Sequence, residues 1–410
     1  MRKLKHIIVL LTIALLANSC KDTCYTTRKE MVSVADYAEA NMVLNTFQVQ
    51  APRGIAKPGN IYTYGNYLLV CEHEQGIHIL DNTNPSAPIA LKYIKLVGND
   101  NIAVKDHFLY ADNGTDLLAI DINDLDNITV ANKVENAFPE RLKDGKILVG
   151  YHIEEKTVKV PCNSNRGTVF SPGRQDMMAS GAEASGVTGK GGSMARFVVA
   201  DNFLYIAKAD KFVPYNLATP SNPKPSAAQG FPAQNIETCF QYKDNLFFGA
   251  SDGVYIYNYK SSPESPSYVS EISHVMGCDP VVVQNDYLFS TVRGGSMCRT
   301  TNSVNLLYLY DIKNITSPNM VATENQQSPY GLGVNGQLLV VCNGINGMMV
   351  YNWEESSQKI TLRSSYPDIH AFDVIMNGNT MIVTADNGLF QFDCTDPSNI
   401  KYLSTLVKFK

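Results

Sequence analysis

Short apolar runs alternate with turn residues over most of this chain. In the last repeat the runs cover residues 372–376, 380–384, 389–392 and 401–409, and the turns between them contain Gly378-Asn379, Asp386-Asn387-Gly388 and Pro397. Gly and Asn accept the positive φ of tight hairpins, while Val, Ile, Phe and Tyr suit half-buried strands. Four short antiparallel strands in about forty residues predict one blade of a β-propeller.

The turn between the first two strands of this unit recurs along the chain. It lies at Gly65-Asn66, Lys105-Asp106, Asp144-Gly145, Asp201-Asn202, Asp244-Asn245, Asn285-Asp286, Asn335-Gly336 and Gly378-Asn379. The third strand ends at a polar residue in most copies, such as Asp81 or Asp393, which predicts an Asx turn. We therefore predict an all-β propeller of four-stranded blades, with eight blades favoured and seven as the alternative.

The N-terminus has the pattern of a secretory signal. Positive residues precede an apolar run at 7–17, which is too short to cross a bilayer as a mature helix. The segment Leu15–Cys20 resembles a bacterial lipobox, so residues 1–19 are predicted to be a signal peptide and Cys20 the lipidated residue. Lys21-Asp22 resembles outer-membrane and surface-export signals. The predicted location is the outer membrane, anchored in its lipid and surface-exposed, with a periplasm-facing protein or an ordinary secretory signal as alternatives.

The rest of the chain divides into a tether and one large domain. Residues 20–58 are predicted to be the tether, with a short helix at 34–42 and a β-like run at 43–49. Residues 59–410 are predicted to be a single propeller with insertions at 163–194 and 293–304. The first insertion is rich in Gly, Ser and Ala and cannot bury much apolar surface, which predicts a long loop leaving the propeller.

The charge balance argues against one class of partner, and the cysteines predict a disulfide. The formal net charge is −5, and loss of residues 1–19 removes three positive charges, which leaves −8. This balance argues against a nucleic-acid partner. An oxidising envelope permits disulfides, and Cys278 and Cys298 bracket the first two strands of the sixth repeat, so a bridge between them is predicted.

Propeller geometry predicts where a ligand would bind. The loops that lead into the innermost strands and the hairpins between second and third strands share one face, at the mouth of the central channel. The candidates there are His73, Arg141, Arg196, Glu237, Asp279, Arg293, Tyr330, His370 and Asp373. Mixed charges around a concavity favour a small polar ligand, a peptide or a glycan. Charges that pair with one another or hold ordered water are the alternative.

Catalytic signatures are absent from the sequence. It has no Gly-x-Ser-x-Gly, His-Glu-x-x-His or Cys-x-x-Cys pattern, and no cofactor is predicted. Glu72 and Glu74 share a strand face, which is too little to predict a metal site. An enzyme is therefore not favoured; the alternative is a surface hydrolase or lyase on polysaccharide or peptide, with Glu237 and Asp279 as its carboxylates. A purely structural member of an outer-membrane assembly is a third possibility.

Several phrases of the sequence resemble a known repeat family. Residues 76–88 read Gly-Ile-His-Ile-Leu-Asp-Asn-Thr-Asn-Pro-Ser-Ala-Pro, which resembles the LVIVD-repeat proteins, and residues 193–197, 236–238 and 278–281 look like phrases of their bacterial lipoprotein branch. The resemblance implies a β-propeller and brings no established activity or ligand. The predicted function is a lipid-anchored cell-envelope propeller that acts as a binding or scaffold module, with its ligand at the channel mouth.

Overall fold

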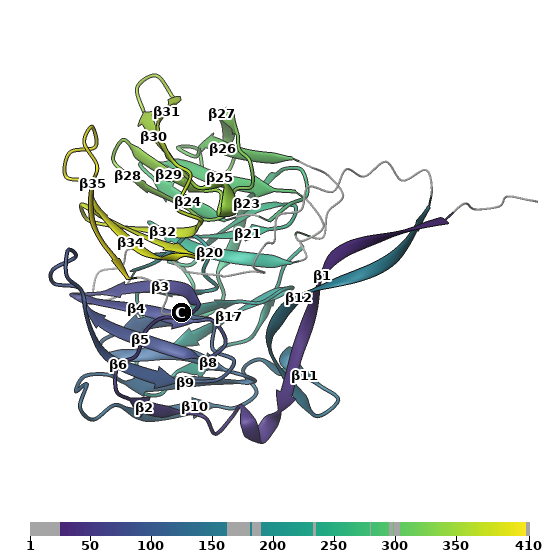
Figure 1. Ribbon diagram of the computed structural model, residues 1–410, viewed down its shortest axis with the longest axis vertical. Helices are drawn as coiled ribbons and strands as arrows, with labels where there is room; N and C mark the ends of the chain where they lie inside the picture. The colour runs from purple at the N-terminus through teal and green to yellow at the C-terminus, as the bar shows by residue number, and fades with distance from the viewer. Residues whose placement is uncertain are drawn as a thin grey trace, which may run out of the picture. The chain divides into compact units, whose positions relative to one another are not determined.

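The computed structural model describes residues 25–161, 181–182, 190–232, 235–278, 280–294, 298 and 304–406. These residues form eight β-sheets (Figure 1), and the predicted all-β propeller fold is confirmed. Within the described part of the chain, no helix has the length and apolar character needed to cross a membrane. The predicted signal peptide, Cys20 and Asp279 lie outside the described residues.

Among the described residues, seven sheets contain the predicted four-stranded unit. Blade 1 is β3 (Pro58–Tyr64), β4 (Tyr67–Glu72), β5 (Gly76–Asp81) and β6 (Ile89–Lys95); blade 2 is β7 (Ile102–Lys105), β8 (Phe108–Asn113), β9 (Asp116–Asp121) and β10 (Thr129–Val134). Blade 3 is β15 (Phe197–Ala200), β16 (Phe203–Ala207) and β17 (Lys211–Asn216), with β18 (Lys224–Pro225) and β19 (Gln229–Gly230) both paired to β17.

The remaining four blades follow in chain order. Blade 4 is β20 (Ile236–Tyr242), β21 (Asn245–Ala250), β22 (Gly253–Asn258) and β23 (Ser267–Ser273); blade 5 is β24 (Val281–Gln284), β25 (Tyr287–Arg293), β26 (Asn305–Asp311) and β27 (Asn319–Asn325). Blade 6 is β28 (Leu332–Asn335), β29 (Leu338–Cys342), β30 (Met348–Glu354) and β31 (Lys359–Tyr366); blade 7 is β32 (Ala371–Asn377), β33 (Thr380–Ala385), β34 (Gly388–Asp393) and β35 (Lys401–Leu406).

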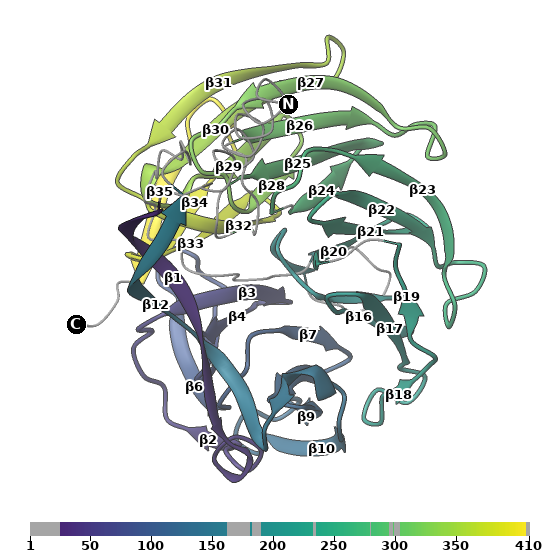
Figure 2. The same cartoon turned by 90° about the vertical axis from the view of Figure 1, so that its right-hand side faces the viewer.

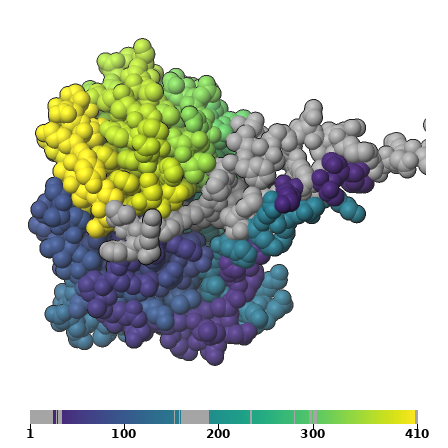
Figure 3. Space-filling model, viewed as in Figure 1, coloured from purple at the N-terminus to yellow at the C-terminus, as the bar shows by residue number. Residues whose placement is uncertain are grey.

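The innermost strands of these blades form a closed cycle. Each of β3, β7, β15, β20, β24, β28 and β32 contacts the next, and β32 contacts β3 (Figure 2). Blade 7 lies directly against blade 1 (Figure 3), and the side-chain amides of Asn82 and Gln391 join them by hydrogen bonds of 2.9 and 2.8 Å. The ring thus closes by packing and side-chain bonds between two blades that are each built from one continuous segment.

Within the described residues, the third repeat does not form the blade that its turn at Asp144-Gly145 predicted. One long strand, β12 (Lys146–Pro161), pairs with β11 (Leu142–Lys143) and β1 (Tyr25–Glu39) in a three-stranded sheet. Residues 152–157 contain no Gly, Asn, Asp or Pro to turn the chain back. The eight sheets therefore match the number of repeats, while the closed cycle has the seven blades of the alternative prediction.

A hydrogen bond that recurs between neighbouring blades supports the placing of blade 3 directly after blade 2 in the ring. The Tyr110 hydroxyl of blade 2 donates to the Pro220 carbonyl of blade 3 at 2.8 Å. The Tyr205 hydroxyl of blade 3 makes the same bond to the Pro263 carbonyl of blade 4 at 2.9 Å. Blade 2 therefore meets blade 3 in the way that blade 3 meets blade 4, although sixty-two residues separate β10 from β15.

The chain divides into two compact units. The larger one includes residues 35–151 and the described residues from 181 onward, and so contains all seven blades. The smaller one includes residues 25–34 and 152–161, where Lys29 Nζ lies 2.9 Å from Glu155 Oε2. The long strands β1 and β12 each contribute to both units.

The predicted tether contains more regular structure than its composition suggested. The predicted helix at 34–42 is wrong, because β1 extends to Glu39 through its pairing in the three-stranded sheet and only a 3-10 turn, Ala40–Met42, follows. Of the β-like run predicted at 43–49, only the end is a strand: β2 (Gln48–Gln50) pairs with the outer strand β6. Most third-strand ends form Asx turns as predicted; Asp81 Oδ1, for example, accepts from the Thr83 amide at 2.8 Å.

The described end of the first insertion lies inside the ring, contrary to the prediction of a loop that leaves the propeller. β14 (Lys190–Gly191) adds antiparallel to β3, and β13 (Gly181–Ala182) adds parallel to β20. The inner edges of these strands offer unpaired backbone groups, which favours strand addition. Gly192 packs so closely on Asp373 that a Cβ would lie 1.8 Å from its Oδ2, so the absence of a side chain permits this approach.

Candidate functional site

Loops at one face of the propeller enclose a cavity of about 300 Å³, which we call the mouth cavity. It is lined by the hairpins and inner-strand loops of blades 1 to 5 and by residues 148–151 of β12. Four of the predicted residues meet there: His73, Arg141, Arg196 and Glu237. Concave sites of this volume with a few convergent polar groups are typical of small-ligand binding.

His73, in the β4–β5 hairpin, is held between two carboxylates. Its Nε2 lies 2.9 Å from Glu74 Oε1 and its Nδ1 lies 3.1 Å from Asp100 Oδ1. Burial works to lower the pKa of His73, but the two carboxylates outweigh it and raise the pKa to about 9. The imidazole is therefore positively charged at neutral pH. Glu74 Oε1 also accepts from the Tyr151 amide at 2.9 Å, which ties the hairpin to β12.

Arg141 is paired at the back of the same cavity. Its Nη2 donates to Asp112 Oδ2 at 2.5 Å, and its Nη1 donates to the Gly98 carbonyl at 3.2 Å. Asp112 is fully buried and also accepts from the amides of Asp100 and Asn101, both at 2.9 Å. Burial opposes the charge, but Asp112 and Asp100 hold the pKa of Arg141 above its ordinary value. This arginine is therefore part of a closed ion-pair network.

Lys208 and Glu140 complete the charged wall of the mouth cavity. Lys208 follows β16, is 6% exposed, and donates from Nζ to the Ala137 carbonyl, with Glu140 Oε2 at 3.4 Å. Its ammonium lies 5.2 Å from the centre of the Phe138 ring. Burial lowers the pKa of Lys208. The charges on this side of the cavity are thus fixed by partners before any ligand arrives.

Glu237 belongs to the lining of the mouth cavity and also to that of a second, much smaller cavity. β20 has a bulge between Ile236 and Thr238 in its pairing with β21, and Glu237 is the residue in that bulge. Bulges redirect a side chain at the end of a strand. Glu237 lines both the mouth cavity and the neighbouring space of about 10 Å³.

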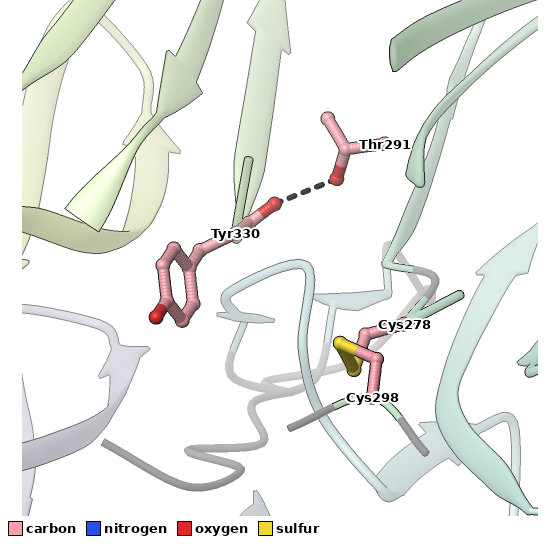
Figure 4. Close-up of a disulfide and its surroundings, with 4 residues drawn as sticks. All are labelled: Cys278, Thr291, Cys298 and Tyr330. Atoms are coloured by element: carbon pink, nitrogen blue, oxygen red, sulfur yellow. Dashed lines mark hydrogen bonds between the residues drawn. A yellow bond between two sulfur atoms is a disulfide. The ribbon is translucent and has the colours of Figure 1, made fainter. Parts of the chain in front are cut away.

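We call this small space the deep pocket; Arg293 and Tyr330 line it. The guanidinium carbon of Arg293 lies 3.8 Å from the centre of the Tyr330 ring. The Cys278–Cys298 disulfide, between the two cysteines paired by the prediction, borders the site, and the Tyr330 carbonyl accepts from Thr291 Oγ1 at 2.6 Å (Figure 4). Cys278 and Arg293 also form a backbone bridge, with hydrogen bonds of 3.0 and 3.1 Å.

Two other predicted residues lie away from both cavities. Asp373 is 2% exposed, and its Oδ1 accepts from Ser193 Oγ at 3.1 Å, so it holds residues 190–193, which we call the channel segment, in place. Burial raises the pKa of Asp373 to about 7, against the opposing effect of hydrogen bonds from Val374 and Ser193. His370 Nδ1 lies 3.0 Å from Asp386 Oδ1 in a partly exposed pair. Asp279 is outside the described residues, so the proposed carboxylate pair with Glu237 is not described.

Glu72 and Glu74 do not converge on a common point. Glu72 is fully buried and accepts from the Ala56 amide at 2.8 Å, with His78 Nε2 at 3.2 Å and an ion pair to Arg53. Burial works to raise the pKa of Glu72, but His78, Ala56 and Arg53 lower it to about 2. Among the described residues, no group of three His, Cys, Asp or Glu side chains is placed to hold a metal ion.

A larger cavity, of about 460 Å³, lies between the inner strands of blades 4 to 7 and the channel segment at 190–193. Two of the lysines that line it are paired, Lys243 with Asp286 at 2.6 Å and Lys260 with Asp201 at 2.8 Å. Much of its wall consists of apolar inner-strand residues, such as Phe240. It brings together none of the nine predicted site residues, so the mouth cavity remains the candidate site.

Sequence reasoning missed Asp100 and Lys208, although a signal for each was present. Asp100 precedes β7 and Lys208 follows β16, so both occupy the same loop positions that supplied the other candidates. Applying the repeat register to every blade would have included them. The contribution of β12 through Gly150 and Tyr151 had no such signal, because the third repeat was expected to be a blade.

The closed cycle of antiparallel blades defines a β-propeller. Residues 56–93, which span most of blade 1, match the LVIVD repeat family. The chain is therefore a β-propeller that contains an LVIVD repeat, and the predicted resemblance to that repeat family is confirmed for this stretch. Comparison with curated protein sequences gives no match.

Solved structures share the architecture at low sequence identity. A protein from Lactobacillus plantarum aligns with a TM-score of 0.56 and 14% identity, over 85% of this chain and 96% of that one. A protein from Desulfotomaculum acetoxidans aligns with a TM-score of 0.54 and 11% identity, over 83% of this chain and 96% of that one. At such identities the similarity concerns the fold alone.

Proposed function

We propose that this protein is a lipid-anchored cell-envelope propeller that binds a small polar ligand, a peptide or a glycan in its mouth cavity. The observation that carries the proposal is the convergence of His73, Arg141, Arg196 and Glu237, from separate loops, on one cavity of about 300 Å³. Most of its charges have fixed partners, so the cavity is preorganised, which lowers the cost of ordering side chains on binding. Cys20, within the lipobox-like segment, supplies the proposed anchor.

Binding at the mouth cavity is tested by partner capture from cell-envelope extract and by glycan and peptide arrays. Arg196→Gln changes one wall of the cavity without touching the Arg141–Asp112 pair. Lys92→Gln is the matched control, because Lys92 lies on the outer strand β6 and pairs with Asp126. We expect Arg196→Gln to lose at least tenfold in captured partner, with Lys92→Gln unchanged. Equal capture by wild type and both variants would show that the assigned face is wrong.

The anchor is tested separately by cell fractionation. In Cys20→Ser the lipid attachment point is removed, so the protein should be lost from the outer-membrane fraction. Retention of Cys20→Ser in the outer membrane at the wild-type level would contradict a lipid anchor at this residue. This result does not depend on the outcome of the binding assay.

A further inference from the structure

Arg293 differs from the other charged groups around the mouth. It is only 6% exposed, yet it forms no ion pair with a described carboxylate, and its Nε has no hydrogen-bond partner among the described residues. The Tyr330 hydroxyl beneath it is also buried and without a described hydrogen-bond partner. A buried charge without a partner is costly. Such groups therefore point to a bound species that supplies the missing acceptor.

The surrounding packing keeps both donors in place. Arg293 ends β25 and is fixed through its backbone bridge to Cys278, which the disulfide joins to Cys298. Tyr330 packs edge-on against Phe372 at 4.9 Å. The two donors are thus held by strand pairing and ring packing, and they line the same deep pocket.

The deep pocket limits what can approach these donors. Its volume of about 10 Å³ suits a single water-sized group. Because Glu237 lines both spaces, a ligand lying in the mouth cavity can extend one group past this residue toward Arg293 and Tyr330. An oxyanion is the group that satisfies two hydrogen-bond donors and one positive charge together.

We propose that Arg293 and Tyr330 form an oxyanion subsite for a ligand that carries a carboxylate, with the rest of the ligand in the mouth cavity. One carboxylate oxygen accepts from Arg293 Nε and from the Tyr330 hydroxyl. A phosphate is disfavoured, because it brings a second negative charge beside Glu237, which lines the same pocket. This inference rests on the proposed function, because it names the ligand class of the same cavity.

The test measures binding of matched acid and neutral probes to the full-length protein by calorimetry. The probes are glucuronate against glucose, a short peptide with a free against an amidated C-terminus, and inorganic phosphate. We expect at least one acid to bind tenfold or more tightly than its neutral counterpart, and the better acid distinguishes a sugar acid from a peptide terminus. Equal binding of acid and neutral probes, no binding of any acid, or tighter binding of phosphate would overturn the proposal.

Variants of the subsite separate this inference from the proposed function. Arg293→Met should abolish the preference for the acid probe over the neutral one, and Arg293→Lys should restore part of that preference. Tyr330→Phe should weaken binding of the acid probe severalfold while keeping the stacked ring. Without ligand, Arg293→Met should raise the melting temperature, because it removes a buried unpaired charge; a lower melting temperature would count against the inference. If Arg196→Gln reduces partner capture while Arg293→Met leaves the acid preference intact, the inference fails and the proposed function stands.

Discussion

The wall of the mouth cavity and the wall of the deep pocket use arginine in opposite ways. On one wall Arg141 binds the buried carboxylate of Asp112, and the nearby His73 lies between Glu74 and Asp100. On the other wall Arg293 is more deeply buried and stacks on an aromatic ring without a described carboxylate partner. The paired wall satisfies its own charges and so holds the loops together. The unpaired wall is the one to which we assign the proposed ligand subsite.

The largest expected effect on stability comes from removing Arg141, the cation that pairs with Asp112. Arg141→Met leaves the fully buried Asp112 without its cation, so we expect a loss of about 3–5 kcal/mol in the free energy of unfolding, measured by urea denaturation. Lys92→Met is the control: its partner Asp126 is 91% exposed, and loss of such a pair costs about 1 kcal/mol or less. Equal losses in the two variants would show that the buried Asp112 does not depend on Arg141 as described.

A smaller effect is expected from breaking the Cys278–Cys298 disulfide, which borders the deep pocket. Cys278 and Cys298 are separated by 20 residues, and a bridge that closes a loop of this length contributes about 3 kcal/mol. Cys298→Ser should lower the unfolding free energy by about this amount and weaken ligand binding, since Cys298 lines the mouth cavity. Reductant should reproduce the loss in the wild type and leave the variant unchanged. A wild type that is insensitive to reductant would exclude a stabilising bridge.

The smallest effect, and the one that depends on pH, concerns His73. Its pKa is about 9 in the folded chain, above the value of about 6.5 expected for the unfolded chain. The stabilisation is therefore complete below pH 6.5 and is lost as pH rises through 9. His73→Gln should lower the free energy of unfolding by about 2 kcal/mol at pH 6, because the charged hydrogen bonds of His73 are lost. At pH 10 the substitution should change this free energy very little. If the difference in unfolding free energy between wild type and variant stays constant from pH 6 to 10, His73 is not charged as described.

The candidate site was predictable where the repeat register applied. His73, Arg196 and Glu237 were found from their loop positions, and the structure places all three in one cavity. The same register could not predict that Arg141 is ion-paired and that Arg293 has no described carboxylate partner, because it identifies both only as basic residues at the channel mouth. Their difference depends on Asp112, which reaches Arg141 from another hairpin. Asp373 was assigned to the mouth by register, but the channel segment covers it through Ser193.

The sequence by itself determined the blade, because hairpin turns and alternating apolar strands are local properties that repeat wherever the residues repeat. It also determined the Asx turns, in which a side-chain oxygen accepts from the backbone amide two residues further along the chain. Only the tertiary structure decided that the third repeat joins β1 instead of forming a blade, and that residues 190–191 add to β3 inside the ring. These outcomes depend on which distant strand edge is available, and on which distant carboxylate reaches a charge; no local pattern encodes either.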